Sequence, residues 1–177
     1  DPVSQMQYCR SLEEAGRWSK AASEYDALVR QWPASAEAVK AQRALADIRW
    51  EREKDVFEAY REYRYLADFY SLSCDYDAVI DKMYELAGVM RVEGKTVMFF
   101  NFRNTVDVRR AYEGCVIRAP GAKWAAQAML QIGELREEIE AMRQLLDCAA
   151  ANIAMLVKEQ GGKRIISADD VKKALGN

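Results

Sequence analysis

The side chains that carry most enzyme chemistry are absent from this sequence or badly spaced in it. The chain contains no histidine, which removes the commonest general base and a principal metal ligand. Carboxylates such as Glu13-Glu14 and Asp169-Asp170 are adjacent, and adjacent side chains diverge on a helix. No group of cysteine and carboxylate residues has the spacing of metal ligands. We therefore expect no enzyme activity, no cofactor and no metal.

One glycine-rich stretch, residues 88–96, resembles a phosphate-binding loop. Lys95 and Thr96 follow Gly94 as that motif requires, but Gly88 lies one residue too far upstream. The stretch also leaves a predicted helix, whereas a phosphate-binding loop leaves a strand and opens a helix. We therefore interpret Lys95 as a solvated loop residue.

Arginines alternate with aromatic residues over residues 60–70, a pattern found in proteins that bind single-stranded nucleic acid. Two of these aromatics, Tyr60 and Tyr63, fall on a buried helical stripe, and neighbouring carboxylates balance the arginines. The whole chain is balanced as well, with 26 basic and 28 acidic residues. We interpret the stretch as core and expect no nucleic acid as a partner.

Three phenylalanines stand in one segment, residues 92–105, that interrupts the helical pattern. They are Phe99, Phe100 and Phe102. Exposed aromatic side chains concentrate binding energy at protein interfaces, so these residues are candidates for partner binding. Alternatively they close the open end of the local core, and the sequence leaves both interpretations open.

The stretch from Gly16 to Pro33 is the element that organises the rest of the chain. Its apolar residues recur at steps of three and four, which places them on one stripe of a helix. They are Trp18, Ala21, Ala22, Tyr25, Leu28, Val29 and Trp32. Gly16 stands where a reversing chain often needs positive φ, and Pro33 cannot extend the helix. This pattern is typical of the second helix of a tetratricopeptide repeat.

The same stripe returns over residues 55–70 and 108–120, with Tyr25, Tyr63 and Tyr112 in one common position. The preceding first helices carry large–small pairs, which let two helices cross closely. The pairs are Tyr8-Cys9, Leu45-Ala46, Leu86-Ala87 and Ile132-Gly133. Hairpins of two helices therefore repeat along the chain.

Three first helices are predicted. The first covers residues 3–15, and the second runs from the N-cap Ser35 to a weakly marked turn at residues 51–54. The third runs from the N-cap Asp75 to about Arg91. Residues expected to face inward recur at helical spacing. They are Val3, Met6, Cys9 and Leu12 in the first helix, Ala38, Ala41, Leu45 and Ile48 in the second, and Val79, Met83, Leu86 and Met90 in the third.

A long helix is predicted over residues 122–160. The apolar face of its second half comprises Ile139, Met142, Leu145, Leu146, Ala149, Ile153 and Leu156. Either this face takes a partner or a second copy, or the segment folds back onto the last hairpin. Gly161-Gly162 ends the helix, and the capping box from Ser167 to Asp170 opens a short final helix.

Taken together, these patterns predict an all-α fold. We expect tetratricopeptide-like hairpins, about three and a half repeats, stacked in a right-handed superhelix with a concave face. The repeat domain is predicted over residues 1–138, and a helical extension of unassigned role over residues 139–177. No stretch approaches the length of apolar sequence that a transmembrane helix needs.

The four cysteines lie far apart and form no CxxC motif. Cys9 and Cys115 fall on helical apolar stripes, where a thiol serves as a small hydrophobic group. We interpret all four cysteines as structural. If the protein is secreted, a disulfide between two of them remains an alternative.

Residues 57–87 and 111–138 together resemble the BamD-like outer-membrane-assembly lipoproteins. The carriers are the Tyr- and Phe-rich second helix that leads to Asp75-Tyr76-Asp77, the insertion before the third second helix, and Ala119-Pro120. The resemblance covers residues 3 to about 138 and implies a periplasmic scaffold tethered to the outer membrane by a lipidated cysteine. Such a scaffold holds the barrel-insertion protein and contacts incoming barrel precursors. No cysteine stands near residue 1, so we expect that the anchor has been trimmed away.

The resulting hypothesis is a non-enzymatic scaffold that binds other proteins in outer-membrane protein assembly. For the concave face we predict contacts from the solvent-facing residues Arg10, Glu13 and Arg43. The alternatives are another repeat adaptor, either an envelope or division coordinator or a cytoplasmic peptide-binding module, and a helical domain appended to an enzyme. The sequence leaves the partner and the oligomeric state open.

Overall fold

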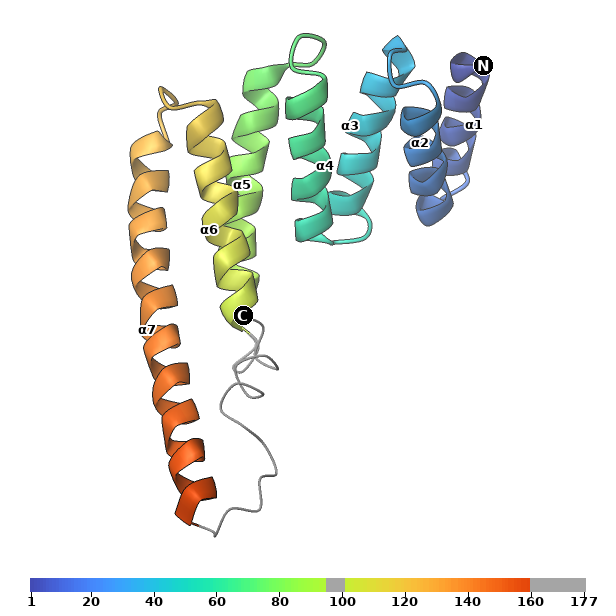
Figure 1. Ribbon diagram of the computed structural model, residues 1–177. Coiled ribbons are helices and arrows are strands. Elements are labelled where there is room, and N and C mark those ends of the chain that lie inside the picture. The colour runs from blue at the N-terminus through green and yellow to red at the C-terminus, as the bar shows by residue number, and fades with distance from the viewer. Residues whose placement is uncertain (95–100, 160–177) are drawn as a thin grey trace. The chain divides into compact units, whose positions relative to one another are not determined.

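The computed structural model describes residues 1–94 and 101–159, and every regular element in those ranges is an α-helix. The helices are α1 (Pro2–Glu14), α2 (Trp18–Gln31), α3 (Ala36–Glu51), α4 (Val56–Phe69), α5 (Tyr76–Gly94), α6 (Asn101–Arg118) and α7 (Ala125–Glu159) (Figure 1). The predicted all-α class is confirmed. None of these described helices is both long enough and apolar enough to cross a membrane.

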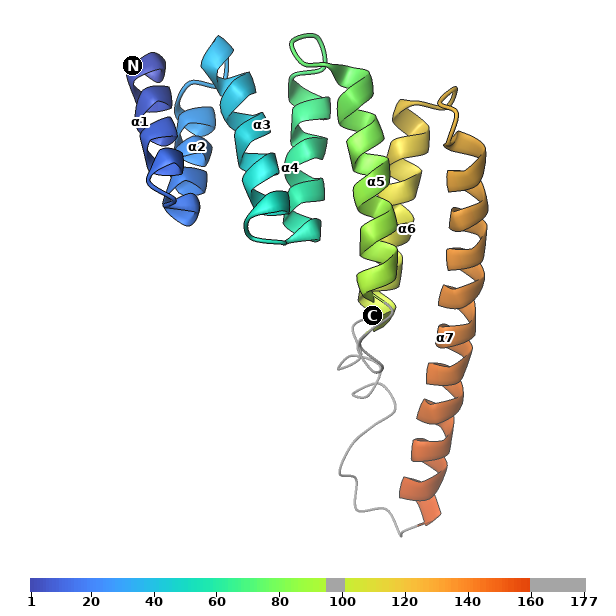
Figure 2. The same ribbon diagram turned by 180° about the vertical axis from the view of Figure 1, so that it is seen from behind.

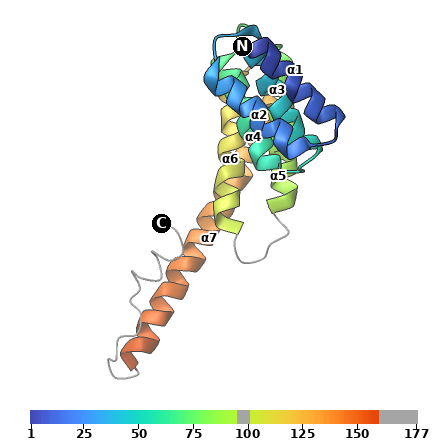
Figure 3. The ribbon, with the colours of Figure 1, turned by 90° about the vertical axis from the view of Figure 1, so that its right-hand side faces the viewer.

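The chain divides into a larger unit, Asp1–Ile132, and a smaller unit, Gly133–Asn177. Within the larger unit, α1 to α6 stand side by side in chain order, as two opposite views show (Figures 1 and 2). Each of these helices packs against the next, and α1 also contacts α3. Figure 3 looks along this row from its α1 end.

Side-chain caps start the helices where the sequence predicts. The Ser35 hydroxyl accepts a hydrogen bond from the Ala38 amide at 3.1 Å, and the Asp75 carboxylate accepts one from the Ala78 amide at 3.3 Å. Asp55 caps α4 in the same way. Each cap satisfies an amide that has no partner inside its helix, which is worth about 1 kcal/mol.

The turns show one confirmed prediction and one surprise. Gly16, between α1 and α2, has the predicted positive φ of 69°. The turn after α3 contains no glycine, and there Lys54 takes the left-handed conformation with φ 58°. A side chain costs free energy in this conformation, so a turn of this kind usually contains glycine. Because this turn has none, no local signal in the sequence marked it.

The core follows the predicted stripes. Tyr25, Tyr63 and Tyr112 are all buried, so the position they share in sequence is also a shared position in the core. The inward residues predicted for the first helices are buried as well, with the exception of Val3. Burying each large apolar side chain contributes roughly 1.5–3 kcal/mol, which is how helices too short to fold alone become stable together.

Several predicted inward positions are wrong. Val3 and Tyr8 are 51% and 41% exposed, because α1 packs on α2 and α3 and its other side has no neighbour among the described residues. Gly133 is exposed, and a Cβ built on it would meet nothing within 4 Å, so no helix among the described residues crosses closely there. The irregular segment predicted at residues 92–105 is also too long, since α5 reaches Gly94 and α6 begins at Asn101.

The predicted long C-terminal helix is confirmed as α7, which runs unbroken to Glu159. On its predicted apolar face Ile139 is buried and Met142 is half-buried, whereas Leu145 and Ile153 are exposed. Gly161-Gly162 and the capping box from Ser167 to Asp170 lie outside the described residues.

Candidate functional site

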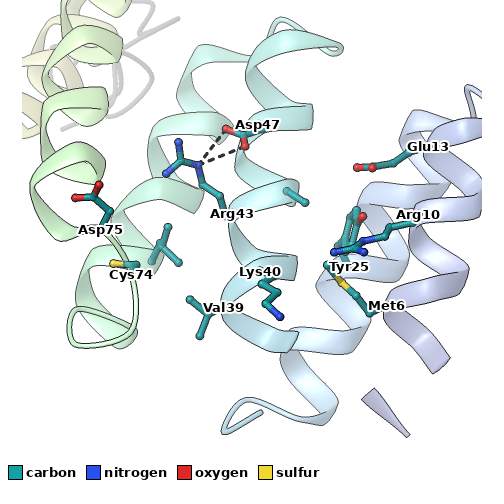
Figure 4. Close-up of a pocket in the computed structure, with 12 residues that line it drawn as sticks. Met6, Arg10, Glu13, Tyr25, Val39, Lys40, Arg43, Asp47, Cys74 and Asp75 are labelled. Atoms are coloured by element: carbon teal, nitrogen blue, oxygen red, sulfur yellow. Dashed lines mark hydrogen bonds and ion pairs between the residues drawn. The ribbon is translucent and has the colours of Figure 1, made fainter. Parts of the chain in front are cut away.

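A pocket of about 400 Å³ opens in the larger unit over the first helices α1 and α3 (Figure 4). We call it the α1–α3 groove. Its lining residues are Met6, Arg10, Glu13, Tyr25, Val39, Lys40, Arg43, Ala44, Asp47, Leu66, Cys74 and Asp75. The three groove residues proposed from the sequence, Arg10, Glu13 and Arg43, therefore lie around one hollow.

Helix geometry places these charges on one surface. Arg10 and Glu13 are three residues apart on α1, and Arg43 and Asp47 are four apart on α3, so each pair projects from one helix face. Contact between α1 and α3 brings the two faces together. The groove thus depends on the alternation of first and second helices, which sets the first helices next to one another.

One side of the groove is built on the buried Tyr63. Its hydroxyl donates a hydrogen bond to the Asp47 carboxylate, which also pairs with the Arg43 guanidinium at 3.3 and 3.4 Å. The Arg43 guanidinium lies over the Tyr63 ring at 5.2 Å from its centroid. Burial, and then the Asp47 carboxylate, raise the pKa of the Tyr63 hydroxyl above its usual range, so it remains a neutral donor.

On the other side of the groove, Arg10 and Glu13 of α1 lie beside the buried Tyr25 of α2. Burial, and then the Glu13 carboxylate, raise the pKa of the Tyr25 hydroxyl, while Arg10 opposes the rise. Each half of the groove thus sets an arginine and a carboxylate on a first helix over a buried second-helix tyrosine. The buried ring fixes the wall, and the charged groups remain at the rim.

Two cations of the groove are available to a ligand. Arg10 and Lys40 are exposed, and neither forms an ion pair or a side-chain hydrogen bond within the described part of the chain. Asp75 at the far end is exposed, and its carboxylate caps α5. Free cations beside carboxylates and apolar wall residues suit the charges and amides of an extended polypeptide segment.

The lining of the groove contains one cysteine, Cys74. Burial raises the pKa of the Cys74 thiol, the one thiol in the lining, and so holds it in its less nucleophilic protonated form. Among residues 1–94 and 101–159, no group of three or more cysteine and carboxylate residues is placed to hold a metal ion. All four cysteines are free; Cys9 and Cys115 are buried as predicted, and Cys148 is exposed.

The phenylalanine cluster stays a prediction. Phe99 and Phe100 lie outside the described residues, and Phe102 is the second residue of α6, where the structure describes the helix but not this side chain. Three of the twelve lining residues were proposed from the sequence, and Met6, Tyr25 and Lys40 are among those that it missed. A signal existed for Lys40, which lies one turn before Arg43 on the same helix face.

Comparison with protein-family models and with curated proteins finds no match to this sequence. Two features of the chain itself therefore bear on its function. One is the recurrence of the helical stripe and its buried tyrosines, and the other is the charged groove that the first helices form.

Proposed function

We propose that this chain is a non-enzymatic scaffold that holds a segment of another protein in the α1–α3 groove. The single observation that carries the proposal is the convergence of Arg10, Lys40 and Arg43 at one open pocket whose wall is a buried tyrosine. Rigid walls with charges at the rim let a partner bind without ordering the site first, which lowers the entropic cost of association.

We further propose that the hairpins are tetratricopeptide-like repeats, stacked as a right-handed superhelix, and that the protein acts in outer-membrane protein assembly in the bacterial periplasm. Support comes from the recurring stripe and from the resemblance of residues 57–87 and 111–138 to the BamD-like lipoproteins. The alternatives remain a different envelope or division adaptor, a cytoplasmic peptide-binding module and a helical accessory domain of an enzyme. The test of the periplasmic assignment is the gene upstream of residue 1: a signal sequence that ends in a lipobox would favour it, and the absence of one from the full gene would contradict it.

A matched pair of charge reversals tests the groove. Arg43→Glu changes an arginine of the groove, whereas Arg30→Glu changes an arginine that pairs with Asp26 on α2, outside the lining. Each arginine forms an ion pair with a carboxylate four residues away on the same helix, and both pairs are at least partly exposed. Because exposed ion pairs contribute little to stability, both variants should fold.

In a pull-down from envelope extract, we expect Arg43→Glu combined with Arg10→Ala to reduce capture of the partner about tenfold, which corresponds to about 1.4 kcal/mol. Arg30→Glu should leave capture unchanged. If the parent chain, the double variant and Arg30→Glu capture the partner equally and have the same melting temperature, the partner does not bind in the groove.

A further inference from the structure

The second half of α7 carries a stripe of exposed residues on the side away from its buried ones. Leu145 and Met155 are 71% and 61% exposed, although large apolar side chains are usually buried. Ala141, Cys148 and Asn152 are exposed on the same side of the helix. We call these five residues the α7 seam. All of them belong to the smaller of the two units.

The seam differs from the apolar face that the sequence predicted for this helix. Of that face, Ile139 is buried, and Met142 and Leu146 are half-buried. By the turn of about 100° per residue, the seam lies about 130° around the helix from these three residues. The side of α7 that the fold buries and the side that carries the seam are therefore different.

The spacing of the seam indicates what kind of surface would cover it. Its five residues follow one another at steps of four, three, four and three. These steps average about 3.5 residues, the repeat that keeps a stripe facing its neighbour when two helices pack along each other. An extended segment or a loop has no such repeat, so the spacing favours another α-helix.

Four charged side chains of α7 lie on other sides of the helix, at least about 100° from the seam. They are Arg136, Glu140, Arg143 and Asp147, all of them exposed. From its first to its last residue the seam itself contains no charged side chain. It therefore does not select a partner by charge, and the sizes of its side chains decide what fits.

Size alternates along the seam in a way that matches the seam to itself. Leu145 and Met155 are large, whereas Ala141 and Cys148 are small. When two copies pack together, the large side chains of one copy can fill the space above the small residues of the other. Asn152 is the polar member, and its amide both donates and accepts hydrogen bonds, so it can pair with an amide of the second copy.

We propose that the α7 seam is a dimer interface, in which it packs antiparallel against the seam of a second copy of this chain. The carboxylates that precede the seam on the same side of the helix decide the orientation. They are Glu134, Glu137 and Glu138. A parallel pair would set the carboxylates of both copies side by side, which costs free energy, whereas an antiparallel pair places them at opposite ends.

Sedimentation of the full chain at about 10 µM and about 100 µM tests the interface. We expect a monomer–dimer equilibrium whose dissociation constant rises at least about tenfold in Ala141→Glu and in Leu145→Glu, because each variant puts a charge into the seam. Ala154→Glu is the matched control, since Ala154 is exposed on α7 about 140° from the seam. It should leave the dissociation constant unchanged. Circular dichroism verifies that each variant is folded.

Crosslinking tests the orientation. In a background of Cys74→Ser and Cys148→Ala, one chain carries Ala141→Cys and a second, tagged chain carries Met155→Cys. The two remaining cysteines are buried. A short bismaleimide should join the two different chains and should not join either chain to its own copy, because an antiparallel pair brings opposite ends of the seam together.

Three results would contradict the proposal. They are a monomer at about 100 µM chain, a dimer that both seam variants leave intact, and crosslinks only between identical positions, which would show a parallel pair. A monomer would exclude the second copy as the occupant of the seam. The α1–α3 groove lies in the larger unit, so Arg43→Glu should dimerise like the parent chain. Failure of this inference is therefore distinguishable from failure of the groove proposal.

Discussion

The second and third hairpins use the same core position and present different chemistry above it. In the second hairpin, Arg43 and Asp47 surround the hydroxyl end of the buried Tyr63. In the third hairpin the matching first-helix positions hold Tyr84 and Gly88. Tyr84 lies edge-on to the buried Tyr112 with 5.8 Å between centroids, and a Cβ on Gly88 would lie 3.7 Å from the Tyr112 hydroxyl.

This contrast shows that the hairpins keep one core position while the residues above it differ. The tyrosine slot and the apolar stripe remain the same, because each hairpin must bury its stripe against its neighbours to be stable. The first-helix positions above the slot are half-buried, and their residue types differ between the two hairpins. Near α1 and α3 they form a charged groove, and near α5 they form an aromatic stack that includes Trp124.

The largest effect is expected when the common slot itself is emptied. Tyr63→Ala and Tyr112→Ala should each lower the free energy of unfolding by about 3–5 kcal/mol, because both remove a buried ring and leave a cavity. Urea unfolding followed by circular dichroism measures both values. If the free energy of unfolding falls by less than about 1 kcal/mol in one variant and by several times more in the other, the two tyrosines do not occupy equivalent positions.

A smaller effect is expected when only the hydroxyl of Tyr63 is removed. Tyr63→Phe keeps the ring and removes the hydrogen bond to Asp47, so we expect a loss of about 1–2 kcal/mol. The ion pair between Arg43 and Asp47 should survive. In the double variant Tyr63→Phe, Asp47→Asn the two losses should be less than additive, and simple additivity would show that the hydroxyl and the carboxylate are not coupled.

The smallest effect concerns two buried thiols, Cys9 in the first hairpin and Cys115 in the third. Burial raises the pKa of each to about 11 from the ordinary 9.0. Below pH 9 both thiols are neutral in the folded and unfolded chain, and their contribution to stability is fully present. Between pH 9 and 11 the unfolded chain ionises first, so this contribution is lost as the pH rises.

Urea midpoints at pH 8 and pH 10.5, measured under reducing conditions, test this window. The midpoint should fall between the two pH values, and Cys9→Ala and Cys115→Ala should each make the fall smaller. If both variants lose stability as steeply as the parent chain, the thiols are not the groups responsible.

Sequence reasoning recovered what depends on local spacing. Gly16, Ser35 and the three slot tyrosines were predicted because caps, turns and helical stripes are properties of a few consecutive residues. Val3, Tyr8 and Gly133 were assigned to the interior wrongly, since their exposure depends on whether a neighbouring helix exists.

The candidate site shows the same limit. Arg10, Glu13 and Arg43 were proposed one by one as solvent-facing charges, and helix periodicity is enough for that. Their common groove, and the part that Tyr25 plays in its wall, depend on how α1 packs on α3, which no single stretch of sequence encodes.

Site-specific photocrosslinking in cells tests the central claim most directly. A photoreactive benzoylphenylalanine replaces Ala44, which lines the α1–α3 groove, or Ala27, which is an exposed residue of α2 outside the lining. The account predicts a discrete crosslinked protein from position 44 and none from position 27. No crosslink at position 44, or the same crosslinked protein from both positions, would contradict it.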